Sequence, residues 1–193
     1  AWAWEVQPHG AGLSYFDLVL DHYRALRRAG LSVDVLPPRA RFESYAAILA
    51  PGTMLMDDAL KTRLSESGAA VLIGPRSAAR GPDFAIPVPL PPDFPGLDVT
   101  VARVETFRAD QPRPLAGGGA VRAYLEEIEG GAETVLSTPD GQPVAMHRGR
   151  IAYMGGWGDD AALDRLVTDL CARAGLARLD LPEGVRVRDT GAE

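Results

Sequence analysis

Ala69-Ala70-Val71-Leu72-Ile73-Gly74-Pro75 is the stretch of sequence that decides the fold. A short, uninterrupted apolar run that Gly-Pro closes is typical of a parallel strand covered on both faces. Tyr45 to Ala50 has the same character and is closed by Pro51-Gly52. Between the two runs, Leu60 and Leu64 follow Asp57-Asp58 at helical spacing, and Gly68 ends that segment. The strand–helix–strand pattern predicts a parallel sheet with right-handed crossovers.

Two further helices flank these runs. Ser14 is placed to cap the first, with Asp17 three residues on, and Gly30 ends it. Its expected apolar stripe is Phe16, Val19, Leu20, Tyr23 and Leu26. The last helix is expected to begin near Asp159, and its stripe is Leu163, Leu166, Val167, Leu170, Cys171 and Ala174.

The remaining strands follow from alternation and from turn signals. Leu31 to Val35 alternates apolar and polar residues, which predicts a strand buried on one face. Six prolines between Pro82 and Pro95 predict a long irregular loop. Further strands are expected at Leu97–Phe107, Val121–Leu125, Glu133–Thr138, Ile151–Met154 and, leaving the domain, Leu179–Arg188, with hairpin turns at Asp140-Gly141 and Arg148-Gly149. The fold class is therefore α/β, an open, mostly parallel sheet with helices on both faces.

Composition excludes several classes of function. The chain has 193 residues, is 46% hydrophobic and carries a net charge of −6, which suits one globular domain and argues against a nucleic-acid partner. No apolar run approaches the ~20 residues of a membrane span, so no membrane partner is expected. Nothing at the start resembles a signal peptide, and the single cysteine, Cys171, excludes an internal disulfide. We expect a cytoplasmic protein.

The loops after the buried strands carry no nucleotide motif. Ligands of such sheets bind at the carboxyl ends of the strands, where Pro51-Gly52-Thr53, Gly74-Pro75-Arg76-Ser77 and Gly155-Gly156-Trp157-Gly158 would lie. None of these loops is a phosphate cradle, and proline at 51 and 75 removes backbone donors. We expect no cofactor.

Candidate catalytic groups are better explained as structural. Cys171 falls on the apolar stripe of the last helix, whereas a nucleophilic thiol sits on a tight turn after a strand beside a histidine. His9, His22 and His147 have no partners at ligand spacing, which predicts surface or locally bonded histidines and no metal site. Glu126-Glu127 on an extended segment would point to opposite faces, so they do not form a catalytic pair. The residues alone favour a non-catalytic or binding domain.

Whole segments of the chain resemble a known family. Seven of them, in order over nearly the full length, are similar to the middle domain of β-galactosidases of glycoside hydrolase family 42, of the Thermus type. These segments are Trp4–Gly10 with Ser14-Tyr15, Tyr23–Pro38, Gly74–Ser77, Leu90–Pro92, Val101–Glu105, Gly156-Trp157 and Leu181–Arg188.

The resemblance implies a fold and a role. It implies a three-layer, flavodoxin-like fold similar to class I glutamine amidotransferases, without their nucleophile, that assembles subunits into a homotrimer. Besides other copies of the chain, the resemblance implies a second partner, a (β/α)₈ barrel that precedes this domain in the same polypeptide. That barrel would hold both catalytic glutamates of a retaining galactosidase. No catalytic residue is thus expected here. Residues 1–178 would form the trimerisation domain, with its first core strand upstream of Ala1, and residues 179–193 would begin a linker or strand towards a C-terminal β domain.

Four residues are candidates for subunit contacts or for packing against the barrel: Trp2, Trp4, Arg76 and Trp157. Two alternatives remain open. One is a free-standing amidotransferase-like hydrolase, which would need a reactive thiol in a cleft. The other is a carbohydrate-binding module that uses Trp2, Trp4 or Trp157 as stacking platforms.

Overall fold

The computed structural model describes residues 2–8, 10, 12–108, 110–182 and 184–188. His9 and the last five residues of the expected linker lie outside these ranges, as does Glu183. The helices are α1 (Trp2–Val6), α2 (Tyr15–Arg28), α3 (Asp58–Glu66) and α4 (Asp160–Ala174). The strands are β1 (Ala47–Ala50), β2 (Ala70–Ile73), β3 (Thr100–Thr106), β4 (Arg113–Pro114), β5 (Ala120–Glu129), β6 (Glu133–Ser137), β7 (Pro143–Arg148), β8 (Ile151–Met154) and β9 (Gly156–Gly158).

The main sheet has five strands in the order β1-β2-β8-β7-β6. Strands β1, β2 and β8 are parallel, whereas the hairpins at Asp140-Gly141 and Arg148-Gly149 make β6, β7 and β8 antiparallel neighbours. The sheet is therefore mixed. The expected α/β class is confirmed, and its parallel part is the three strands that the apolar runs predict.

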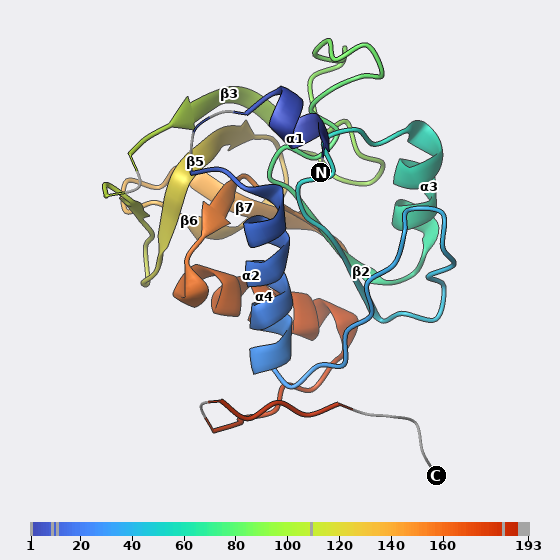
Figure 1. Cartoon of the computed structure of the whole chain (residues 1–193), viewed down its shortest axis with the longest axis vertical. Coiled ribbons are helices and arrows are strands. Elements are labelled where there is room, and N and C mark those ends of the chain that lie inside the picture. The colour runs from blue at the N-terminus through green and yellow to red at the C-terminus, as the bar shows by residue number, and fades with distance from the viewer. Residues whose placement is uncertain (1, 9, 11, 109, 183, 189–193) are drawn as a thin grey trace.

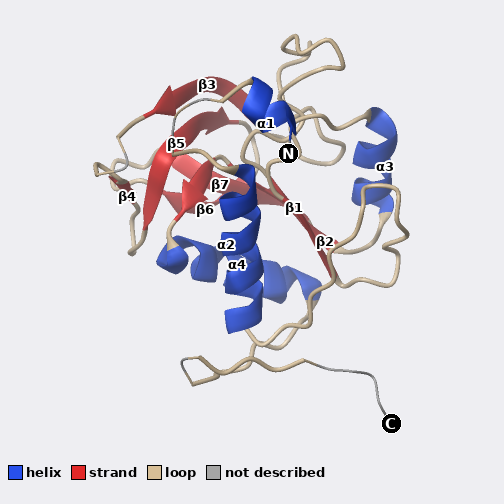
Figure 2. Cartoon of the chain, in the orientation of Figure 1, coloured by secondary structure: helices blue, strands red, loops and turns tan. Residues whose placement is uncertain are grey.

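Helices cover both faces of this sheet (Figures 1 and 2). Side chains alternate across a strand, so Ala70 and Leu72 of β2 pack in one apolar cluster with α2 and α4. Val71 and Ile73 point the other way and pack with Leu64 of α3. The result is the three-layer arrangement expected from the sequence.

A second, antiparallel sheet has the order β3-β5-β4, and β9 also pairs with β5. Because β9 follows β8 after a single residue, this pairing joins the second sheet to the carboxyl end of the main sheet. The sequence predicted the long irregular loop at 82–95 and strands near β3 and β5, but not their assembly into a separate sheet.

The expected helix ends are confirmed. The Ser14 side chain accepts a hydrogen bond from the Asp17 amide at the start of α2, and Asp159 accepts from Ala162 at the start of α4. The expected stripe of α2 is wrong in part. Leu18, Ala25 and Leu26 are buried, whereas Phe16, Leu20 and Tyr23 are exposed.

Two expected strands are wrong. Residues 31–37 carry no helix or strand, although Leu31 and Val33 are half-buried against the core as the alternation predicts. The described residues of the tail, 176–182 and 184–188, are also without regular structure. Alternation determines which side chains are buried, but a strand must also pair with another strand, and neither segment joins a sheet of the described residues.

Strand β1 forms an open edge of the main sheet. All four of its residues are half-buried, whereas all four of β2 are buried. The carbonyl oxygen of Ala46 accepts a hydrogen bond from the Ala70 amide of β2. Backbone groups alternate in direction along a strand, so those of Ile48 and Ala50 also face β2. The backbone groups of Ala47 and Leu49 face away from β2, towards the open edge. No helix in the described ranges is long and apolar enough to cross a membrane.

The close approach of β2 to β8 gives a testable prediction. Gly74 has φ +92°, and a Cβ there would lie 2.3 Å from Met154 O. Gly141 also has φ +92°, but a Cβ there would meet nothing within 4 Å. We expect Gly141→Ala to cost roughly 1–2 kcal/mol of unfolding free energy, from backbone strain alone. Gly74→Ala adds a clash with backbone and should cost at least about 3 kcal/mol.

Urea unfolding of the two variants and the parent chain measures both values. An equal loss of unfolding free energy in the two variants would contradict the close packing of β2 against β8.

Candidate functional site

Three loops converge at the carboxyl ends of β1, β2 and β8. The Gly74 amide donates to Ser77 Oγ at 2.8 Å, and that hydroxyl donates to Ala50 O at 3.2 Å. Trp4 of α1 donates its indole N–H to Gly52 O at 2.7 Å. This is the crevice in which open α/β sheets bind ligands, and here α1 lies over it (Figure 1).

Arg76 occupies the tight turn after β2. Its φ of +59° is a left-handed conformation that non-glycine residues seldom adopt. The side chain is only 1% exposed, lies with Cζ 4.3 Å from the Trp4 ring, and donates from Nη2 to Gln7 O at 2.6 Å. Burial lowers the pKa of Arg76. Among the described residues, Nε and Nη1 have no hydrogen-bond partner.

Glu126 of β5 accepts three hydrogen bonds. They come from the Tyr124 hydroxyl at 2.8 Å, the Tyr153 hydroxyl at 2.7 Å and the Arg76 amide at 2.9 Å. Burial raises the pKa of Glu126 to about 7, against the lowering effect of these donors and of the Arg76 charge. The carboxyl group therefore titrates near neutrality and joins β5, β8 and the turn after β2.

The sequence did not reveal this role for Glu126. Its neighbour Glu127 points to the opposite face, as expected, and pairs with Arg103 at 2.6 Å. Burial of Glu126 depends on β8 and the turn after β2, which are distant in sequence. The available signal is Tyr124, which lies two residues earlier on the same face of β5.

A second polar cluster fixes α2 to the smaller sheet. Asp21 Oδ2 accepts from Arg122 Nη2 at 2.6 Å and from Trp157 Nε1 at 3.1 Å. The Arg122 guanidinium also lies 5.1 Å from the Trp157 ring. This cluster is part of the packing between α2, β5 and β9.

Three of the four candidate contact residues are buried together. Trp4 and Trp157 share one apolar cluster with Leu18, and Arg76 stacks on Trp4. Trp2 is separate: it is 58% exposed, and its ring meets that of Phe84 at 5.2 Å. A stacking platform must be exposed, so among the tryptophans Trp2 is the one available for a carbohydrate ring or a partner.

The remaining candidate groups are structural. Cys171 is buried within α4, and burial raises its pKa, which disfavours the reactive thiolate. Arg76, rather than a cysteine, occupies the turn after β2. His22 is buried, with Nδ1 2.8 Å from Leu18 O, so it is locally bonded but not on the surface. Within the described residues no group of histidine, cysteine and acidic side chains is arranged to hold a metal.

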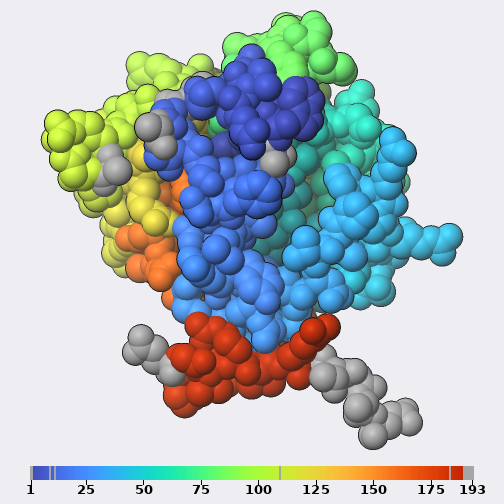
Figure 3. Space-filling view, in the orientation of Figure 1, coloured from blue at the N-terminus to red at the C-terminus, as the bar shows by residue number. Residues whose placement is uncertain are grey.

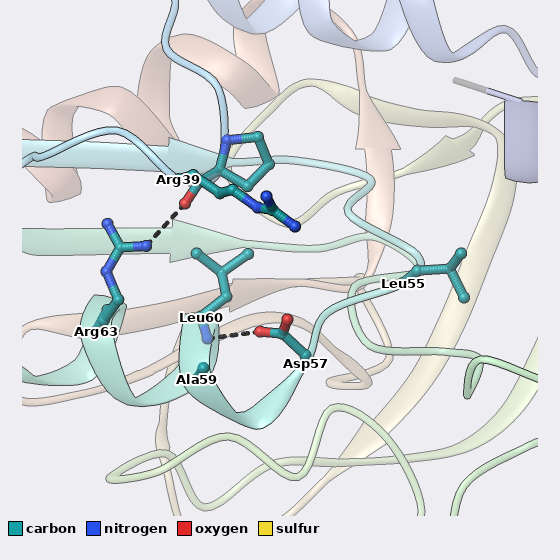
Figure 4. Close-up of a pocket in the computed structure, with 7 residues that line it drawn as sticks. Arg39, Leu55, Asp57, Ala59, Leu60 and Arg63 are labelled. Carbon is teal, nitrogen blue, oxygen red and sulfur yellow. Dashed lines mark hydrogen bonds between the residues drawn. The ribbon is translucent and has the colours of Figure 1, made fainter.

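One surface pocket, of about 280 Å³, lies between residues 38–39 and the start of α3 (Figure 4). Two of the polar side chains that line it, Asp57 and Arg63, are used in the fold. Asp57 caps α3 by accepting from the Leu60 amide at 2.8 Å, and Arg63 donates to Pro38 O at 3.0 Å. These two side chains therefore serve as a helix cap and a loop anchor.

A family model described as "Beta-galactosidase trimerisation domain" matches residues 1–177. This chain belongs to that family. A β-galactosidase of Thermus thermophilus is 36% identical over 99% of this chain, and one of Halorubrum lacusprofundi is 31% identical over 96%. The chain spans about 30% of the length of these relatives. The domain is thus similar to one portion of a longer polypeptide.

Solved structures agree with this assignment. The β-galactosidase of the psychrophilic Marinomonas ef1 has a TM-score of 0.92 and 30% identity; the match covers 97% of this chain and 29% of that one. A glutamine amidotransferase matches 81% of this chain and 94% of its own, with a TM-score of 0.52 and 16% identity. That second likeness shows the fold alone. The amidotransferase-like fold expected from the sequence is confirmed.

Glu126 gives a prediction about pH. Its pKa of about 7 lies above the ordinary value of 4.5, so the folded state disfavours the carboxylate. The free energy of unfolding should therefore fall as pH rises from about 4.5 through 7, by up to about 3 kcal/mol. We expect Glu126→Gln to remove this part of the pH dependence, because the amide stays neutral.

Urea unfolding at pH 5 and pH 8 measures the difference for each protein. Glu127→Gln, on the opposite face of β5, is the matched control and should keep the parent pH dependence. Identical pH dependence in Glu126→Gln and the parent chain would disprove the assignment.

Proposed function

We propose that this domain joins the subunits of a longer β-galactosidase into a homotrimer and has no catalytic group of its own. The observation that carries the proposal is the match of residues 1–177 to a family described by its trimerisation role. Hydrolysis of terminal β-D-galactosides would then be performed by a catalytic barrel in the remaining length of the polypeptide, in the cytoplasm.

The crevice supports a non-catalytic role. Trp4 and Arg76 fill the place where an enzyme of this fold would bind substrate, and both are buried. A guanidinium on the turn after β2 is a poor nucleophile, because arginine remains protonated. The amidotransferase-like alternative lacks an exposed thiol, since Cys171 is buried in α4.

The open edge of β1 fits a junction with the rest of such a polypeptide. Trp4 of α1 binds Gly52 O, directly after β1, so α1 lies at the carboxyl end of that strand. A strand parallel to β1 would end at this same side of the sheet and lead into α1. We propose that residues preceding α1 in the longer galactosidase supply the first core strand, and that residues 179–193 begin the connection to a following β domain.

The trimer is tested by light scattering coupled to size-exclusion chromatography of the 193-residue chain. We expect a mass of three times 20.6 kDa at micromolar concentration. A mass of 20.6 kDa across the accessible concentration range would contradict self-association through this domain.

The junction is tested by backbone amide exchange. In the 193-residue chain, we expect fast exchange at Ala47 and Leu49, whose amides face the open edge, and slow exchange at Ile48 and Ala50, whose amides face β2. In a longer galactosidase that contains this domain, Ala47 and Leu49 should become as slow as their neighbours. Unchanged fast exchange there would show that no strand joins this edge.

A further inference from the structure

The outer side of α2 carries an apolar stripe that is exposed in the described part of the chain. Phe16, Leu20 and Tyr23 follow each other at i, i+4 and i+7, so they share one side of the helix. Their exposed fractions are 69%, 40% and 38%. Leu18 and Ala25 occupy the opposite side. Leu18 packs with Trp4 and Trp157, and Ala25 packs in one cluster with residues of α4. A helix that is apolar on both sides is typical of one covered on both sides.

The stripe continues over α1 and the proline-rich loop. Trp2 and Val6 are the exposed apolar residues of α1, one helical turn apart. The edge contact between Trp2 and Phe84 joins α1 to the loop, which then exposes Ile86, Val88 and Leu90. In Figure 3 the atoms of α1, α2 and this loop form one continuous front surface. We call it the α1–α2 face: Trp2, Val6, Phe16, Leu20, Tyr23, Ile86, Val88 and Leu90.

The area of this face is that of a subunit contact. Eight large apolar side chains that are on average more than half exposed present on the order of 700 Å². The largest apolar patch of an ordinary monomer is about 300–600 Å², and a stable interface buries about 800 Å² on each partner. Asp17 and Arg24, seven residues apart on α2, provide a polar rim of both signs beside the stripe.

We propose that the α1–α2 face binds a second copy of this chain and forms the contact around the threefold axis. This proposal rests on the proposed trimer. In a ring of three subunits, each subunit contacts its two neighbours through two different patches, and one patch binds the other patch of the next subunit. The α1–α2 face has two such patches, a straight helical stripe on α2 and the projecting loop with Val88, which is 94% exposed.

Charge placed on this face tests the assignment. We expect Phe16→Asp and Val88→Asp each to raise the dissociation constant of the trimer by at least about thirtyfold, since each buries a carboxylate in the contact. Leu20→Asp and Val104→Asp form a matched pair, because both side chains are 40% exposed and Val104 lies on β3, outside the face. Leu20→Asp should weaken the trimer, and Val104→Asp should leave it intact.

Sedimentation velocity over a concentration series measures these constants, with far-ultraviolet circular dichroism as the check on folding. The parent chain could be a trimer while its Phe16, Leu20 and Val88 variants form trimers with the same dissociation constant. That result would disprove the α1–α2 face as the subunit contact, but it would not contradict the trimer itself. A monomeric parent chain would instead overturn the proposed function.

A thiol reporter covers the case in which a charged variant does not fold. Phe16→Cys keeps a small apolar side chain there, and the native Cys171 is buried. We expect the thiol at position 16 to be protected from alkylation in the trimer and reactive after dilution to monomer. Equal reactivity at both concentrations would also overturn the face.

Discussion

The hydrogen bonds to the buried carboxyl group of Glu126 are the interaction on which the rest of the arrangement depends. Through them β5 of the smaller sheet is joined to Tyr153 of β8 and to the amide of Arg76 after β2. Burying a carboxyl group is unfavourable unless donors surround it, and three donors do so here. The geometry of the turn after β2 therefore depends on a second sheet, which is formed by residues far along the chain.

The turn after β2 also explains why side chains fill the crevice at the carboxyl ends of the strands. With its amide bound to Glu126, Arg76 directs its side chain under Trp4, and α1 then closes over both. A site that would bind a substrate in an open α/β enzyme is thereby converted into core. Recognition by an outer surface depends on apolar area and shape more than on a few reactive groups.

Local features of the fold could be predicted from the sequence, and contacts between distant segments could not. Ser14 and Asp159 cap helices because capping involves only the next three residues, and the apolar run at Ala70–Ile73 predicts a buried strand wherever it pairs. The segment 31–37 fails as a strand because pairing needs a neighbour that alternation does not supply. Burial of Glu126 likewise depends on β8 and Arg76, and no local pattern contains that information. Trp4, Arg76 and Trp157, expected as subunit or barrel contacts, are buried within this domain.

The edge of β1 and the outer side of α2, both in the described part of the chain, differ in chemistry, and each would suit a different kind of partner. The edge of β1 presents backbone N–H and C=O groups at Ala47 and Leu49, which a strand can satisfy and a set of side chains cannot. The outer side of α2 has all its backbone bonds within the helix and presents side chains alone, such as Phe16 and Leu20. A surface of that kind is satisfied by another packed surface and needs no change of fold. Covalent continuity suits the edge of β1, because a strand inserted beside it becomes part of the core. Association between subunits would suit the α1–α2 face, because side chains on a helix surface can be covered without any change of fold.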